Sequence, residues 1–210
     1  MDSDYPLFLA YAYTCGELQR DALKTVTDEK LALVREMIGS GEVEVKLLRS
    51  LYAQAFRRLE EVAQATGLAP LSTENIDAYF LFYHNAYIDA GDGNYATLPL
   101  SLCEYCKVRV VKIVDVLETR MFTIAPLHAE TVPVAVASDL VPQGMPGDLL
   151  VIHQGSAVQT ITEERLTSLE KHAATELLAS LRARALRARA ETPQREEPTR
   201  RPSRASRARP

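Results

Sequence analysis

The sequence predicts an α+β protein in which an N-terminal helical bundle precedes a small OB-like β-barrel, followed by a C-terminal helix and a disordered tail. Apolar residues recur at spacings of three and four up to about residue 90, which is typical of helices. Short β-branched runs separated by turn residues follow. We divide the chain into a helical domain (1–97), a barrel (98–161), a helix (162–190) and an Arg/Pro-rich tail (191–210).

The helical part shows one long amphipathic stripe with clear end signals. Its members are Leu48, Leu51, Tyr52, Ala55, Phe56, Leu59, Val62 and Ala63. Gly67 and then Pro70 are typical of a helix end. A shorter helix is predicted over 28–38, before Gly39 and Gly41.

A further helix carries the aromatic side chains of the bundle. Ser72 has the side chain of a helix N-cap, and Tyr79, Phe80, Tyr83 and Tyr87 follow it. The turn Gly91-Asp92-Gly93 ends this helix. We therefore expect about four packed helices, the last of them aromatic-rich.

The periodicity changes after residue 107. Strands are predicted over 108–116, 121–124, 131–137, 149–152 and 158–161. So few strands would leave unpaired edges in an open sheet, which favours a closed barrel. Thr162 begins a final helix whose apolar face is Leu166, Leu169, Ala173, Leu177 and Leu181. After Glu191 no large apolar residue occurs, so ordering that segment would cost entropy without burial.

Charge is distributed unevenly. Ten Arg against three Glu over 182–210 give +7, so the remaining residues sum to −11 within a total of −4. An acidic body argues against nucleic-acid binding.

The sequence holds no apolar run of membrane-spanning length, and its first residues, MDSDYPLF, carry acids where a signal peptide has basic residues. We expect a cytoplasmic protein without a membrane partner.

Three cysteines point to metal or redox chemistry. Cys103 and Cys106 form a CxxC pair before a strand, and Cys15 stands far from them. Thiolates are soft ligands for iron, zinc or copper. A zinc site normally has four ligands, so Cys15 and one His could complete the set. The alternative is that the cysteines are small buried apolar residues.

A second candidate site lies at the junction of the two domains. His84 and Asp89 precede the CxxC pair and could join Cys103 and Cys106 in a metal or acid–base site. The alternative for His84 and Asp89 is a capped helix end before a Gly-Asp-Gly turn.

Two strings resemble the HypC/HupF/HybG family of hydrogenase assembly chaperones. They are CEYCKVRVVKI (103–113) and DLVPQGMPGDLLVIHQGSAVQTITEE (139–164). Cys103 stands where the family has its essential cysteine near the N-terminus, and His153 matches the family histidine of the His-x-Gly-x-Ala turn. The chain departs from the family in its long N-terminal extension and in having Lys107-Val108 where the family has Pro-Gly.

The resemblance implies a non-enzymatic chaperone for metallocofactor assembly. Such proteins hold an iron with cyanide and carbonyl ligands transiently, and pass it from a HypD-like scaffold protein to the hydrogenase large-subunit precursor. Cys103 would then be the principal iron or partner contact, with His153 and Cys106 as further ligands or donors. Gly155 would permit close approach of a partner, and Asp148 would set a turn that also matches the family.

Two other function classes stay open. One is a metal-binding protein or enzyme that uses the junction site of His84, Asp89, Cys103 and Cys106. The other is an interaction module without metal, in which bundle and barrel scaffold a complex.

Overall fold

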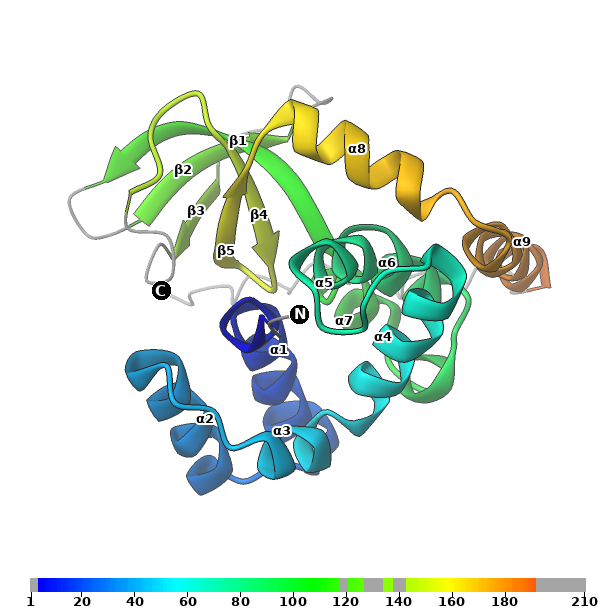
Figure 1. Cartoon of the computed structure of the whole chain (residues 1–210), viewed down its shortest axis with the longest axis horizontal. Helices are drawn as coiled ribbons and strands as arrows, with labels where there is room; N and C mark the ends of the chain where they lie inside the picture. The colour runs from blue at the N-terminus through cyan, green and yellow to red at the C-terminus, as the bar shows by residue number, and fades with distance from the viewer. Residues whose placement is uncertain (1–3, 118–120, 127–133, 138–142, 192–210) are drawn as a thin grey trace, which may run out of the picture.

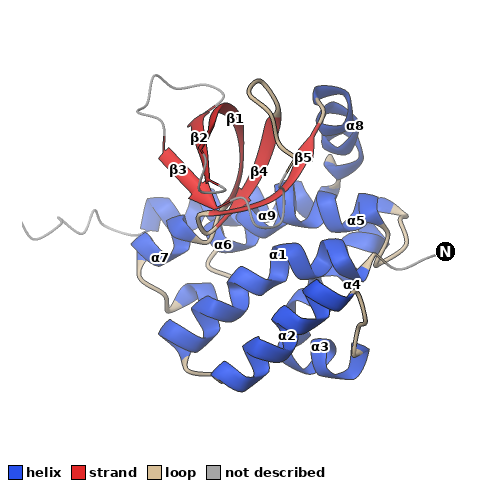
Figure 2. Cartoon of the chain, turned by 90° about the vertical axis from the view of Figure 1, so that its left-hand side faces the viewer, coloured by secondary structure: helices blue, strands red, loops and turns tan. Residues whose placement is uncertain are grey.

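A computed structural model gives the structure of the chain and describes residues 4–117, 121–126, 134–137 and 143–191. Helices precede and follow one curved sheet, which confirms the α+β class (Figure 1). The earlier helices lie against one end of the sheet (Figure 2). No helix in the described ranges has both the length and the apolar character needed to cross a bilayer.

Seven α-helices precede the sheet among the described residues. They are α1 (Tyr5–Leu18), α2 (Asp28–Ser40), α3 (Val45–Leu51), α4 (Ala53–Thr66), α5 (Thr73–Ala78), α6 (His84–Asp89) and α7 (Leu100–Tyr105). The predicted start of α2 is confirmed, with Thr27 as N-cap, and so is the capping of α5 by Ser72, whose hydroxyl accepts from the Asn75 amide at 3.3 Å.

The long apolar stripe is interrupted at Tyr52, which separates α3 from α4. Its backbone leaves the helical region at φ −117° and ψ 33°. The Tyr52 hydroxyl fills space beside Gly16, where a Cβ would come within 2.7 Å of it. The helix therefore breaks where tertiary packing of Tyr52 outweighs local helix propensity.

A π-helical turn, Tyr79–Tyr83, joins α5 to α6. Such turns admit one extra residue into the helical hydrogen-bond ladder and are frequent at functional sites. His84 is the first residue after the turn.

The sheet contains five strands among the described residues. They are β1 (Val108–Leu117), β2 (Met121–Pro126), β3 (Val134–Ala137), β4 (Leu149–His153) and β5 (Ser156–Ile161). They follow the order β1-β2-β3-β5-β4, with β4 returning to β1. All neighbours are antiparallel except β3 and β5, which meet at the single pair Ala137–Ser156. In place of the expected barrel, the structure has a curved sheet of antiparallel neighbours. Its edge strands β3 and β5 are joined by that single residue pair.

Most predicted strands are present within a few residues of their expected bounds. The start of the third predicted strand, 131–133, lies outside the described residues, as does the tail from 192 onward, which we expected to be disordered.

Apolar side chains form two main clusters on opposite faces of β4. One cluster joins the helices to the sheet and includes Phe8, Leu59, Phe80, Val151 and Val158. The other fills the inside of the curved sheet with Val111, Ile113, Phe122, Ile124, Leu150 and Ala157. Because β4 is buried on both faces, its sequence is continuously apolar.

The single helix predicted after Thr162 is divided in two. Thr162 is the N-cap as expected, and its hydroxyl accepts from the Arg165 amide at 3.2 Å. The segments are α8 (Glu163–Ala173) and α9 (Glu176–Glu191), separated at Ala174, where ψ is 67°. Tyr83 donates to the Ala173 carbonyl at 3.1 Å, so the freed backbone acceptor has a partner.

Candidate metal centre

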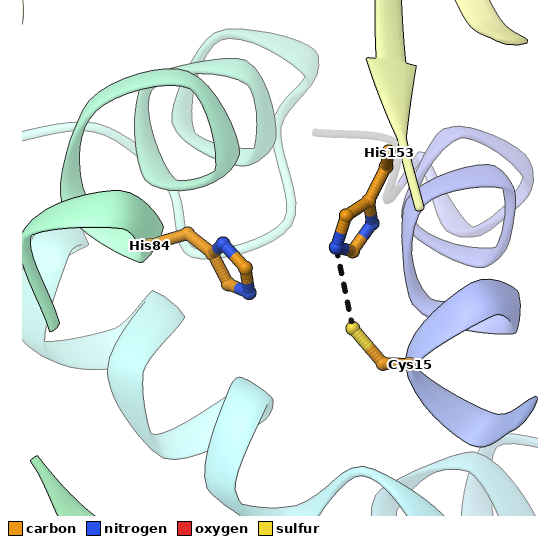
Figure 3. Close-up of side chains that lie close together, drawn as sticks. All are labelled: Cys15, His84 and His153. Carbon is orange, nitrogen blue, oxygen red and sulfur yellow. Dashed lines mark hydrogen bonds between the residues drawn. The ribbon is translucent and has the colours of Figure 1, made fainter. Parts of the chain in front are cut away.

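Three side chains from separate elements converge where α1, α6 and β4 meet. They are Cys15 on α1, His84 at the start of α6 and His153 at the end of β4 (Figure 3). One potential ligand atom from each lies within 4.8 Å of the other two. Both histidines are almost fully buried.

The backbone of α1 determines the orientation of His153. Its Nδ1 lies 2.9 Å from the Tyr11 carbonyl oxygen and 3.0 Å from the Thr14 hydroxyl. Because a carbonyl only accepts, Nδ1 carries the proton and Nε2 carries the lone pair. Nε2 lies 3.8 Å from the Cys15 sulfur. In metal-binding histidines, one ring nitrogen typically donates to a carbonyl or carboxylate while the other ring nitrogen binds the metal. His153 has this arrangement, with Nε2 facing the sulfur of Cys15.

His84 stands edge-on to His153, with ring centroids 5.2 Å apart at an angle of 80°. Its Nε2 lies 3.2 Å from the Tyr95 hydroxyl. Its Nδ1 is buried and has no hydrogen-bond partner among the described residues. An unpaired buried polar atom is costly, so this ring is under-satisfied in the protein alone.

Burial makes the three groups uncharged at neutral pH. It lowers the pKa of His153 to about 4, against smaller opposite effects of the Tyr11 and Cys106 backbones. Burial, and then repulsion from His153 when that ring is protonated, lower the pKa of His84 well below its usual value. Burial also raises the pKa of the Cys15 thiol. The site therefore offers a metal two imidazole lone pairs and one thiol. The thiol would release its proton when it binds the metal.

The CxxC pair lies in a separate apolar cluster with Ile88. Cys103 is 7% exposed, and its sulfur donates weakly to the Tyr95 and Leu98 carbonyls at 3.7 and 3.9 Å. The Cys106 sulfur accepts from the Gln154 side chain at 3.5 Å. Burial raises the pKa of both thiols, that of Cys106 to about 12. Such thiols are poor nucleophiles.

The other sequence candidates have structural surroundings. Asp148 accepts from the Met145 amide at 2.9 Å, which shapes the turn before β4. Gly155, at φ 77°, forms the hairpin turn between β4 and β5 together with Gln154 at φ 51°. Asp89 pairs with Lys107 and Arg189, both at 2.8 Å.

The structure thus brings His84 and His153 together, and Cys15 is the third residue of the group. Cys103, Cys106 and Asp89 stand outside that group. The signal for Cys15 in the sequence was the odd cysteine count, together with the two ligands that a lone CxxC pair leaves missing. A cavity of about 250 Å³, lined in part by Cys15 and His84, adjoins the group.

Comparison with known protein families, characterised proteins and solved structures finds no match to this chain.

Proposed function

We propose that this protein binds one transition-metal ion through the Cys15 thiolate, one ring nitrogen of His84 and Nε2 of His153. The observation that carries the proposal is the orientation of His153 by the Tyr11 carbonyl, which directs its lone pair toward Cys15. The spacing supports it, because zinc bonded to one sulfur and one nitrogen at tetrahedral angles separates them by about 3.6 Å.

Zinc is the ion that this donor set fits best. Nitrogen and sulfur ligands are those that Zn²⁺ prefers, and three protein ligands beside a cavity leave a fourth position for an exchangeable group. Binding converts the Cys15 thiol to a thiolate and releases its proton to solvent, so affinity should rise with pH. Copper, iron and nickel accept the same donors and are competitors.

The test is a metal titration of the full chain, reduced and initially metal-free, against a chromophoric chelator. We expect one equivalent of Zn²⁺ to bind. Cys15→Ser, His84→Gln and His153→Gln should each lower the affinity at least about 100-fold. Cobalt substitution adds a second readout, since a thiolate–Co²⁺ charge-transfer band should vanish in Cys15→Ser.

Cys103→Ser and Cys106→Ser are the matched controls, because each removes a buried thiol outside the group. Both should bind zinc as the wild type does and keep the cobalt band. Loss of binding in these variants, with binding retained in Cys15→Ser, would overturn the proposal. Urea unfolding of each metal-free variant establishes that it folds.

A second proposal is a role in metallocofactor assembly, as the HypC-like strings imply. It is favoured by the position of His153, which belongs both to the resemblance and to the metal-capable group. Iron carrying cyanide and carbonyl would be the cargo, and a HypD-like scaffold and a hydrogenase large-subunit precursor the partners.

Infrared spectra of protein purified without oxygen from its native host test this role. Cyanide and carbonyl stretching bands together with bound iron would support it. Bound metal without those bands would contradict it and leave the zinc proposal standing.

A further inference from the structure

The cavity beside the metal centre lies between α1, the α3–α4 break and α6. Its volume is about 250 Å³, enough for a small molecule. Phe80 and Tyr95 give part of its wall an aromatic character.

The buried polar atoms that lack a partner within the described ranges lie at this cavity. In the part of the chain that the structure describes, the buried side-chain polar atoms without a partner are Tyr52 Oη, Arg58 Nε and His84 Nδ1. All three residues line the cavity. The Tyr52 hydroxyl and Arg58 Nε–H are donors, and an unpaired buried donor costs free energy, so the two together call for a ligand that accepts hydrogen bonds.

Among the residues described, the cavity wall contains one buried cation, Arg58. Arg58 is 1% exposed, and its Nη2 donates to the Asp92 carboxylate at 2.7 Å. Asp92 also pairs with Arg184 at 3.1 Å, so one carboxylate faces two guanidinium groups. No acidic side chain is among the described residues that line the cavity. In the described part of the chain, the Nε–H of Arg58 stays free to donate to an anion in the cavity.

Two features distinguish a carboxylate from other anions. Tyr52 O–H and Arg58 Nε–H are donors with no acceptor among the described residues, and a carboxylate offers two acceptor oxygens on one planar group. The aromatic wall suits an organic remainder rather than a bare inorganic ion. Carboxylate oxygen is also a natural zinc ligand.

We propose that the cavity binds a small organic carboxylate through Tyr52 and Arg58, next to the metal held by Cys15, His84 and His153. This inference rests on the proposed function, because it identifies the ligand class for the fourth coordination position. The carboxylate accepts from the guanidinium and the phenol, and the organic part lies against Phe80 and Tyr95.

The test is calorimetric titration of the full chain with butyrate and benzoate, and with the neutral butyramide and benzamide. It is performed on metal-free and on zinc-loaded protein. We expect each carboxylate to bind at least about tenfold more tightly than its amide, and more tightly still when zinc is present. Tyr52→Phe should weaken carboxylate binding about tenfold, and Arg58→Lys by more.

Tyr83→Phe is the matched control, since its hydroxyl bonds to Ala173 away from the cavity, and it should leave the affinity unchanged. Equal affinity for acid and amide, unchanged binding in Tyr52→Phe, or equal competition by inorganic phosphate would overturn the inference. Zinc titration of the same samples without carboxylate reports on the metal proposal separately. Zinc binding without carboxylate binding would therefore contradict the carboxylate site and leave the metal proposal standing.

Discussion

The sulfur of Cys15 on α1 and Nε2 of His153 on β4 lie 3.8 Å apart, although 138 residues separate them in the chain. The contact exists only when the first helix is docked against the end of the sheet. A metal bridging these residues would hold the two parts together, so metal binding and folding should be coupled.

Zinc is accordingly expected to stabilise the fold. A ligand that binds only the native state adds about 2.7 kcal/mol to the free energy of unfolding at 100 times its dissociation constant. Urea unfolding with and without zinc measures this gain. Cys15→Ser should show no gain, and Cys103→Ser the full one. A gain that persists in Cys15→Ser would contradict a site at this cysteine.

Thr14 is expected to act on the metal through His153. Its hydroxyl lies 3.0 Å from Nδ1 and donates to the Tyr11 carbonyl at 3.2 Å. Thr14→Val keeps the shape but removes the hydroxyl, so zinc affinity should fall about tenfold. The comparison is Thr66→Val, whose hydroxyl donates to the Val62 carbonyl far from the site and whose loss should leave affinity unchanged.

Stability of the metal-free protein should fall as the pH is lowered from about 6.5 towards 4. Burial lowers the folded-state pKa of His153 to about 4, against about 6.5 for an unfolded histidine. Between these values only the unfolded chain gains the proton, which costs about 3 kcal/mol of stability for this residue. His84 acts in the same direction.

Urea unfolding at pH 7.5 and pH 5 measures the effect. His153→Gln should flatten the pH dependence, whereas replacement of the exposed His172 by Gln should preserve it. A dependence equally steep in His153→Gln would show that other groups cause it.

Asp77 is expected to be a major link between the helices and the sheet. Its carboxylate accepts from Gln159 on β5 at 2.5 Å and from Arg165 on α8 at 2.6 Å. Asp77→Ala removes the acceptor of the buried Tyr11 hydroxyl and one of the two acceptors of Gln159. Although Arg165 can turn to water, we therefore expect a loss of about 2 kcal/mol. Glu60→Ala breaks the exposed pair with Arg49 and should cost less than about 1 kcal/mol. Similar losses in chemical denaturation would refute this ranking.

Replacing Gly155, in the hairpin turn between β4 and β5, by alanine should lower the free energy of unfolding. At φ 77° an alanine is strained by about 1–2 kcal/mol, even though the added Cβ would meet nothing closer than the Tyr105 hydroxyl at 3.5 Å. Gly39→Ala is the opposite case, because Gly39 is helical with open space around its Cβ position. It should stabilise by up to about 1 kcal/mol. Thermal unfolding of both variants measures the contrast.

Part of the candidate site could be predicted from sequence. His153 was a candidate because it matches the HypC family histidine, and His84 because it precedes Asp89 and the CxxC pair. Their convergence could not be predicted, since it depends on the π-helical turn before His84 and on the register of β4. The CxxC pair was predicted as a metal site from its spacing. In the structure, Cys103 on α7 and Cys106 at its C-cap are buried among apolar side chains.

The sequence by itself determined the α+β class, the helix starts at Asp28, Ser72 and Thr162, and the approximate extent of four strands. These features depend on side chains within a few residues of one another, so the signal is local. The tertiary structure alone decided the break at Tyr52, the division of the last helix, and the meeting of Cys15 with His84 and His153. Each arises from packing between segments distant in the chain, which local propensity does not encode.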